Sequence, residues 1–219
     1  MYILTTISDL IQITPEDFEK PSIHALTDNI NAKYANKIIQ KIGLCICLYD
    51  ILSSSEGLIG HGTGIVNVNV EFRLVVFRPF KGEILQGRIE SSSEAGINLT
   101  MDFFSDIKVP VVGLFEGSQY RHNEGCFVWT TEEGTEYFFD NNETVRFRVE
   151  AETWHDALPQ GPTRRDQDME GEKREPLYCL VGSMQQGGLG PLLWWAGNEE
   201  PAADGAAADG ADGEAVEEE

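Results

Sequence analysis

The residues of this sequence that most often do chemistry in proteins are its four histidines, four cysteines and 37 aspartates and glutamates. The histidines stand in separate segments without the spacing of metal ligands, and no nucleophile elbow accompanies a Ser-His-Asp or Cys-His order. The cysteines, at positions 45, 47, 126 and 179, lack the two-residue gap of a zinc knuckle or redox motif. We therefore expect no active site, no metal and no cofactor, with a hydrolase that uses paired carboxylates kept as an alternative.

A second set of side chains is typical of proteins that bind single-stranded RNA. Such proteins guide phosphates with basic groups and stack bases on aromatic rings. Residues 81–198 hold ten basic and twenty acidic residues, a balance of −10 that repels phosphate. We expect weak, sequence-tolerant RNA binding, and a free-standing RNA-binding protein is the first alternative function. The residues assigned to RNA are Arg88, Lys108, Trp129, Arg146 and Arg148.

The element that organises the chain is a strand expected within residues 64–79. Apolar and polar residues alternate along it with the two-residue period of a half-buried strand. The alternation fails at Val75 and Phe77, so both faces should be covered there. Pro79 ends the strand because proline has no amide proton for the ladder. Phe80 then leads into a new alternating strand, and we predict that this junction is the seam between two domains.

Residues 1–80 are predicted to form a small α/β domain with an antiparallel sheet. A first strand covers residues 1–13, and Thr14 caps a short helix that has Pro15 at its first position. The nearly continuous apolar run 44–52 predicts a central strand buried on both faces. A longer helix begins near Ser22, and an apolar stripe should turn it toward the sheet. The stripe consists of Ile23, Leu26, Ile30, Tyr34 and Ile38.

Residues 81–195 change character and are predicted to form a small closed β-barrel. Short strands are expected at 84–89, 97–101, 126–131, 135–139, 145–152 and 177–182. The polar stretch 158–176 is predicted to be a charged mobile loop. Residues 196–219, with nine acidic and no basic residues, are predicted to be a disordered acidic tail. The fold class is therefore α+β, with an N-terminal α/β domain and a C-terminal barrel.

Composition also bears on the compartment. The formal net charge is −21. The N-terminus has no basic lead and no small-residue cleavage site, and no apolar stretch approaches the ~18 residues that cross a bilayer. The cysteine pattern fits a reducing compartment. We expect no membrane association.

Two motifs carry a resemblance to a known family, Gly43–Leu48 (GLCICL) and Phe72–Glu83 (FRLVVFRPFKGE). They resemble the seventh-subunit family of archaeal and eukaryotic RNA polymerases, and within it the stalk subunits of RNA polymerase III. The resemblance runs from residue 1 to about residue 195. It implies a non-catalytic subunit of a nuclear DNA-directed RNA polymerase, with an N-terminal tip domain and a C-terminal OB-fold of the S-one type.

The resemblance also implies partners. An obligate helical second stalk subunit would form a heterodimer that spans both domains, and the tip would insert into the polymerase III core. The barrel would contact nascent RNA, and initiation factors would dock to support transcription initiation. The tip residues implied are Pro15, Phe18, Leu58, Ile59, Gly60 and Gly62.

A partner or domain seam is expected at the junction of the two domains. Trp194 and Trp195 are predicted to plug this seam against Phe77 and Phe80, in preference to anchoring a partner, because tryptophan is seldom left bare. The stretch 103–107 departs from the His-bearing segment usual in S-one-type OB-folds. The residues assigned to the seam are Val75, Phe77, Phe80, Trp194 and Trp195.

Overall fold

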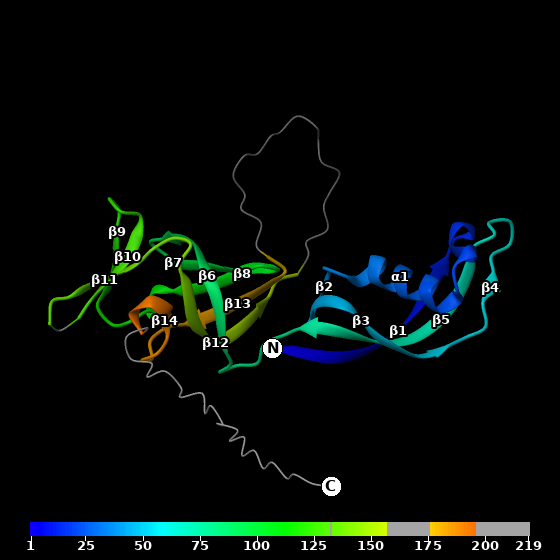
Figure 1. The fold of residues 1–219 in the computed structure, drawn as a ribbon, viewed down its shortest axis with the longest axis horizontal. Coiled ribbons are helices and arrows are strands. Elements are labelled where there is room, and N and C mark those ends of the chain that lie inside the picture. The colour runs from blue at the N-terminus through cyan, green and yellow to red at the C-terminus, as the bar shows by residue number, and fades with distance from the viewer. Residues whose placement is uncertain (132, 157–175, 196–219) are drawn as a thin grey trace, which may run out of the picture.

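The computed structural model describes residues 1–131, 133–156 and 176–195 of the chain. Figure 1 shows an elongated molecule in which a sheet with one helix and a β-barrel lie end to end, with the N-terminus near their junction. The predicted acidic tail, and the predicted charged loop as far as residue 175, lie outside the described residues. Within the described ranges, no helix is long and apolar enough to cross a membrane.

The N-terminal part is built on an antiparallel sheet in the order β1-β5-β3-β2, with β4 also paired to β5. Its strands are β1 (Tyr2–Ile13), β2 (Ile38–Ile39), β3 (Gly43–Ser54), β4 (Leu58–Ile59) and β5 (Val66–Phe77). β5 pairs with β1 along its whole length and with β3 on its other side. Every second residue from Val68 to Val76 is buried, which confirms the predicted organising strand.

The prediction that residues 44–52 form a central strand buried on both faces is wrong. β3 is buried over Gly43, Leu44 and Cys45, but from there its residues are exposed or half-buried. The outer neighbour of β3 is the two-residue strand β2, and α1 covers one face of the sheet (Figure 1). The apolar run therefore keeps an open face.

Helix α1 (Ser22–Tyr34) packs on β1 and β3. Its buried residues are Ala25, Leu26 and Ile30, whereas Ile23 is 65% exposed. The helix thus turns Ala25, in place of Ile23, toward the sheet. The short helix predicted after Thr14 is the 3₁₀ helix η1 (Pro15–Glu19), and the Thr14 side chain makes no capping hydrogen bond.

Five strands form the barrel: β6 (Ile84–Ser93), β7 (Gly96–Met101), β8 (Phe104–Pro110), β12 (Thr144–Trp154) and β13 (Tyr178–Ser183). β6, β7 and β8 form a meander, and β12 returns to pair with β6. β13 closes the barrel by pairing antiparallel with β12 and parallel with β8. This five-stranded closure is the predicted OB-fold barrel.

Between β8 and β12 the chain forms a separate three-stranded sheet, here called the inserted sheet. It follows η2 (Val111–Gly113) and consists of β9 (Ser118–Arg121), β10 (Cys126–Thr130) and β11 (Glu136–Phe139) in the order β11-β10-β9. Residues 126–131 and 135–139 were expected to be barrel strands. They are strands, but both edges of β10 are taken by β9 and β11, so the sheet stays outside the barrel closure.

The end of β5 stays paired in its own sheet but packs its last side chain into the barrel core. Phe77 and Leu44 belong to the hydrophobic core of the barrel. The ring of Phe77 lies 5.0 Å from that of Phe103 and 5.4 Å from that of Phe104, measured between centroids. The covering of both faces predicted at this end of the strand therefore comes from the barrel.

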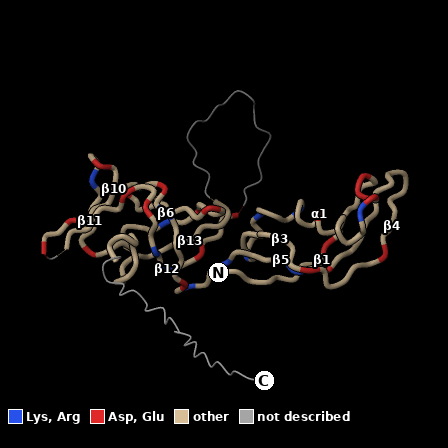
Figure 2. Tube along the Cα trace, viewed as in Figure 1, with Lys and Arg blue, Asp and Glu red and all other residues tan. Residues whose placement is uncertain are grey.

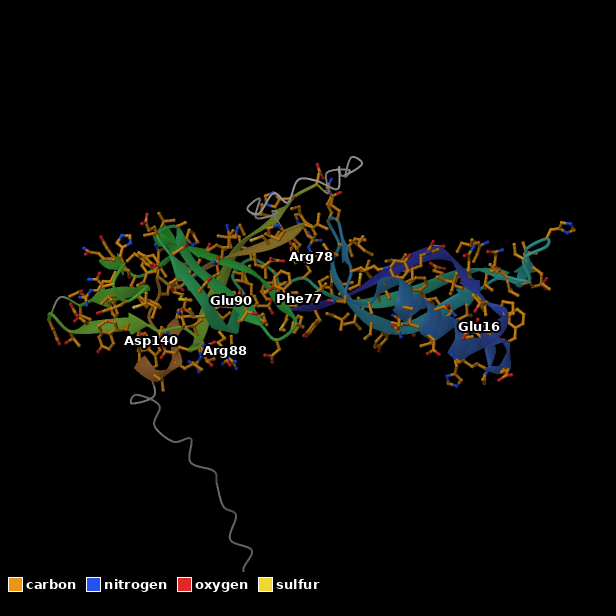
Figure 3. All side chains as sticks on the ribbon, turned by 90° about the horizontal axis from the view of Figure 1, so that it is seen from above. Glu16, Phe77, Arg78, Arg88, Glu90 and Asp140 are labelled. Atoms are coloured by element: carbon orange, nitrogen blue, oxygen red, sulfur yellow. The ribbon has the colours of Figure 1, made fainter. Side chains whose placement is uncertain are left out.

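Charged groups reinforce the junction beside Phe77. Arg78 donates Nε–H to Glu152 Oε2 (3.0 Å), an Nη2 proton to Oε1 of the same carboxylate (2.5 Å) and an Nη1 proton to the Lys41 carbonyl (2.8 Å). The amino group of Met1 pairs with Glu83 at 2.5 Å. Figure 3 shows Phe77 and Arg78 where the two parts of the molecule meet.

The two tryptophans do not lie at this seam, contrary to the prediction. After β13 the chain passes through β14 (Gly190–Pro191) to η3 (Leu192–Trp194), which lies over the inserted sheet. Trp194 packs there against Trp129 and Phe139, with centroid distances of 5.8 and 4.8 Å. Trp195 donates its indole N–H to the Leu189 carbonyl (2.9 Å). Phe80, their expected contact, is exposed.

Candidate interaction surfaces

The tip is the end of the N-terminal sheet farthest from the barrel, where β4 and η1 lie near each other (Figure 1). Leu58 and Ile59 pair with Asn67 and Val66 of β5, yet they are 70% and 73% exposed. Phe18 in η1 is also exposed. The tip therefore presents large apolar side chains to solvent.

The turn beyond β4 brings the two predicted parts of the tip together. Gly62 and Gly64 have positive φ angles of 76° and 70°, a backbone conformation that favours glycine. A Cβ atom at Gly64 would lie 3.6 Å from Pro15 Cγ, so this turn touches the start of η1. Gly60 closes the turn by donating its N–H to the Ile65 carbonyl (2.7 Å).

A second apolar surface lies on the sheet face opposite α1, next to the barrel. Asp9 accepts hydrogen bonds from Lys33 (2.5 Å) and Tyr34 of α1, so odd-numbered positions of β1 face the helix and even-numbered positions face away. Tyr2 and Leu4 therefore lie on the uncovered face, and Leu4 is paired with Val75 of β5. Tyr2 and Leu4 are each about half exposed, and Val75 is half-buried.

This surface continues onto the barrel through Phe103. The Phe103 ring lies 6.3 Å from that of Tyr2, and the side chain is 39% exposed. We call Tyr2, Leu4, Val75 and Phe103 the junction patch. Of the predicted seam residues, Val75 belongs to it, while Phe77 is fully buried beneath it.

The cations predicted to meet RNA do not form one group. Arg88 of β6 lines a hollow of about 210 Å³ together with an acidic residue, Asp102, and with Gln86, Thr100, Phe103 and Thr144. Arg146 of β12 lies diagonally opposite, since Thr144 pairs with Arg88 and Arg146 with Gln86. Figure 3 shows Arg88 beside Glu90 on the barrel.

The other two cations are placed differently. Arg148 donates to Glu150 at 2.9 and 2.6 Å and to Gln186 at 3.0 Å, so its charge is largely compensated. Lys108 of β8 pairs with Asn98 of β7, on the far side of that strand from β6. The structure therefore brings together Arg88 and Arg146 and leaves Arg148 and Lys108 apart.

Trp129, the ring predicted to stack on RNA bases, is engaged within the protein. It stacks on Phe115 at 4.5 Å and on Trp194 at 5.8 Å between centroids. Its indole N–H donates to the Glu116 carbonyl (3.1 Å). A ring that stacks on two neighbours and donates its N–H within the protein serves packing.

Comparison with known proteins shows to which family the chain that carries these surfaces belongs. The family described as RNA polymerase III subunit Rpc25 matches residues 83–195, and the SHS2 domain found in the N terminus of Rpb7p and Rpc25p matches residues 8–64. The "DNA-directed RNA polymerase III subunit rpc8" of Schizosaccharomyces pombe is 43% identical over 202 residues, which cover 89% of this chain and 100% of that protein. The chain belongs to the Rpc25 family of RNA polymerase III subunits. The RPC8 subunit of Saccharomyces cerevisiae is 40% identical over 89% of this chain and 100% of its own length.

More distant relatives of this Rpc25-family chain include archaeal subunits. The "DNA-directed RNA polymerase subunit Rpo7" of Saccharolobus solfataricus is 27% identical over 119 residues, 54% of this chain and 62% of that protein. Both the Rpb7-type N-terminal domain and the barrel agree with the predicted seventh-subunit family. The members of this family are non-catalytic subunits.

Burial shifts the pKa of several titratable groups of this Rpc25-family chain. Among the described residues, no group of three histidine, cysteine or acidic side chains is placed to hold a metal ion. Burial raises the pKa of Asp106 and of Glu143, but these carboxyls lie in different parts of the barrel. Burial raises the pKa of the Cys45 and Cys179 thiols, which favours their unreactive protonated form.

Sequence reasoning missed two parts of these surfaces. Phe103 was treated as part of a stretch that departs from the usual OB-fold pattern, and its place in a β7–β8 turn next to Tyr2 depends on how the two domains meet. The Arg78–Glu152 pair joins residues 74 positions apart. Arg78 lies within the FRLVVFRPFKGE motif, and its charge at the end of an otherwise apolar segment was the available signal.

Proposed function

We propose that this chain is the seventh-subunit component of the RNA polymerase III stalk, which anchors to the polymerase core through the tip and holds a helical second stalk subunit at the junction patch. The barrel in this arrangement lies away from the core, where it contacts nascent RNA weakly and supports transcription initiation in the nucleus. The observation that carries the proposal is the separation of two exposed apolar surfaces, one at the far end of the N-terminal sheet and one beside the barrel.

The tip supports anchoring because its apolar side chains project without a covering element. Leu58 and Ile59 lie on a two-residue strand at the end of the molecule, with the exposed ring of Phe18 in the neighbouring η1. Leaving such side chains in water costs about 1.5–3 kcal/mol each relative to burial. Insertion into a groove of the core recovers that energy.

The junction patch supports a partner that touches both domains. Tyr2, Leu4 and Val75 come from the N-terminal sheet and Phe103 from the barrel, so one apolar partner face would cover the domain boundary. Toward the tip the same sheet face becomes polar, with Arg73 donating to Asp50 (2.7 Å). An amphipathic partner helix could cover the junction patch with its apolar side and place a polar end over the Arg73–Asp50 region.

Affinity isolation of the tagged chain from nuclear extract tests both contacts. The wild-type chain should retain a small helical protein and the large polymerase subunits. Leu58→Asp with Ile59→Asp should lose the large subunits and keep the small partner, whereas Leu4→Asp with Val75→Asp should lose the small partner. The proposal would be contradicted if both double variants melted at the wild-type temperature and still retained the large subunits and the small partner.

RNA contact by the barrel centres on Arg88 and the hollow next to it. Two cations would release about 1.4 ions on binding single-stranded RNA, so the salt dependence should be shallow. In a titration with labelled single-stranded RNA, Arg88→Ala should weaken binding more than Arg148→Ala, because Arg148 is already paired with Glu150. Nanomolar affinity untouched by Arg88→Ala would instead favour a free-standing RNA-binding protein with another binding face.

A further inference from the structure

We infer that the outer edge of β11 in the inserted sheet binds an extended basic segment of a partner protein by strand addition. This edge is separate from the tip, the junction patch and the Arg88 hollow, and the inference does not rest on the function proposed above. It is carried by the open backbone groups of β11 and by the charges at its two ends.

The backbone of β11 has hydrogen-bonding groups turned outward. Thr131 donates its N–H to the Thr135 carbonyl (2.9 Å), which makes this pair a hydrogen-bonded one. Hydrogen-bonded pairs alternate along an antiparallel ladder, so Tyr137 and Phe139 also bond to β10. The N–H and C=O groups of Glu136 and Phe138 therefore point away from β10, and no described strand pairs with them.

This edge lacks three of the devices that keep strands from adding to natural sheets. Natural edges are often blunted by proline, lysine or a bulge. β11 reads Glu-Tyr-Phe-Phe and pairs with β10 in an unbroken register. An added strand can therefore pair with the outward backbone groups of β11. The negative charge of Glu136 favours a basic strand over an acidic one.

The side chains along one face of β11 select a basic partner. Glu136, Phe138 and Asp140 alternate onto that face, so two carboxylates flank a ring with a separation of about 13 Å along the strand. Glu136 and Asp140 are exposed. Residues 114–143 hold seven acidic residues and one basic residue, a net charge of −6, and Figure 2 shows these charges around β10 and β11. This balance excludes RNA.

Arg121 of β9 shows how a cation binds to this face of β11. Its guanidinium pairs with Glu136 and lies 5.6 Å from the centre of the Phe138 ring. Asp140, at the other end of the row, has no ion pair with a described residue. A partner strand with two basic side chains four residues apart and an apolar residue between them would match the row, one pairing with Asp140 and the other taking the place of Arg121 at Glu136.

The test uses the full chain and a labelled ten-residue peptide of alternating valine and threonine with two lysines four residues apart. Controls are the same peptide N-methylated on its backbone and a peptide with glutamate in place of lysine. We expect the lysine peptide to bind at least roughly fivefold more tightly than either control. Amide exchange should slow in residues 136–140. Equal binding of the glutamate or N-methylated peptide, protection elsewhere in the chain, or displacement of the peptide by single-stranded RNA would overturn the inference.

Variants separate the backbone contribution from the charge. Phe138→Pro removes an outward N–H and should reduce binding to the level of the N-methylated peptide, while Phe138→Ala keeps the N–H and should lose less. Asp140→Lys should weaken binding, and the charge-matched control Glu16→Lys, at the other end of the molecule, should not. If Phe138→Pro fails to fold, the N-methylated peptide still decides the question. Unchanged binding by the Asp140 variant would overturn the charge argument.

Discussion

At the scale of single residues, Glu143 lies in an environment that disfavours its charge. Its Oε2 atom is buried without a hydrogen-bond partner, and burial raises the pKa of the carboxyl. A folded-state pKa above the unfolded value means that the folded state binds the proton more tightly, so stability falls as the pH rises through that interval. The ionised side chain therefore destabilises the fold at neutral pH.

We predict that Glu143→Gln raises the melting temperature at pH 7 by roughly 1–3 °C, because a neutral amide costs less to bury than a carboxylate. The gain should disappear near about pH 4, where Glu143 is protonated in both states. Differential scanning calorimetry at the two pH values measures this, with exposed Glu116→Gln as the control. A lower melting temperature at pH 7 would show that the ionised carboxylate has a partner.

Arg78 and Glu152 form the residue-scale link between the two domains. The hydrogen bond from Arg78 lowers the pKa of Glu152. Because the pKa of Glu152 is lower in the folded state, the pair stabilises the protein at pH values above the unfolded-state pKa. That stability is lost as the pH falls through the folded-state pKa. Both side chains are about one-third exposed, so solvent reduces the effect to about 1 kcal/mol or less.

We predict that Arg78→Lys lowers the free energy of unfolding at pH 7 by about 1 kcal/mol, since lysine cannot form the two-pronged contact or reach the Lys41 carbonyl at the same time. The difference from wild type should narrow as Glu152 is protonated. Urea denaturation at pH 7 and at a series of pH values below about 4 follows this narrowing. Arg73→Lys, on a pair within one sheet, is the matched control, and an equal loss from it would mean that Arg78 has no special role at the junction.

At the scale of elements, α1 packs one face on the sheet and leaves Ile23, in its first turn, in solvent. Ile30 is fully buried and Ile23 is 65% exposed. We predict that Ile30→Ala lowers the free energy of unfolding by about 2–5 kcal/mol, whereas Ile23→Ala changes it by less than about 1 kcal/mol. Urea denaturation of the two variants checks this. Similar losses of stability for the two variants would contradict this prediction, because they would mean that Ile23 is buried in the isolated chain.

Elements with a clear period and a local cause were predictable from the sequence. β5 alternates over its length, and Pro15 with Ser22 places the starts of the two helices. The inserted sheet was not separable from the barrel, because Cys126–Thr130 and Glu136–Phe139 have the same alternation as barrel strands and only pairing decides their sheet. The position of Trp194 was equally inaccessible, since it depends on where the chain returns after β13. Trp129 was assigned to RNA because a sequence does not show whether a ring is stacked on Phe115.

At the scale of the whole molecule, the chain is a rod with different chemistry along its length (Figure 1). The tip is apolar and exposed, the junction is apolar on one sheet face, and the barrel carries a small hollow that contains Arg88 and, separately, a strongly acidic inserted sheet. Phe77 and Leu44 of the N-terminal sheet pack into the barrel core and, with the Arg78 contacts, join the two parts. A rigid rod holds the barrel at a defined distance from whatever binds the tip.

The most direct test of the account is site-specific photo-crosslinking in the assembled polymerase. A photoreactive residue is placed at Leu58, at Leu4 or, as a control, at Val112, which is highly exposed on the barrel. We predict that position 58 crosslinks to a large subunit of the polymerase III core, position 4 to a small helical subunit, and position 112 to neither. Crosslinking of positions 58 and 4 to the same protein, or of position 58 to none while the chain remains in the complex, would contradict it.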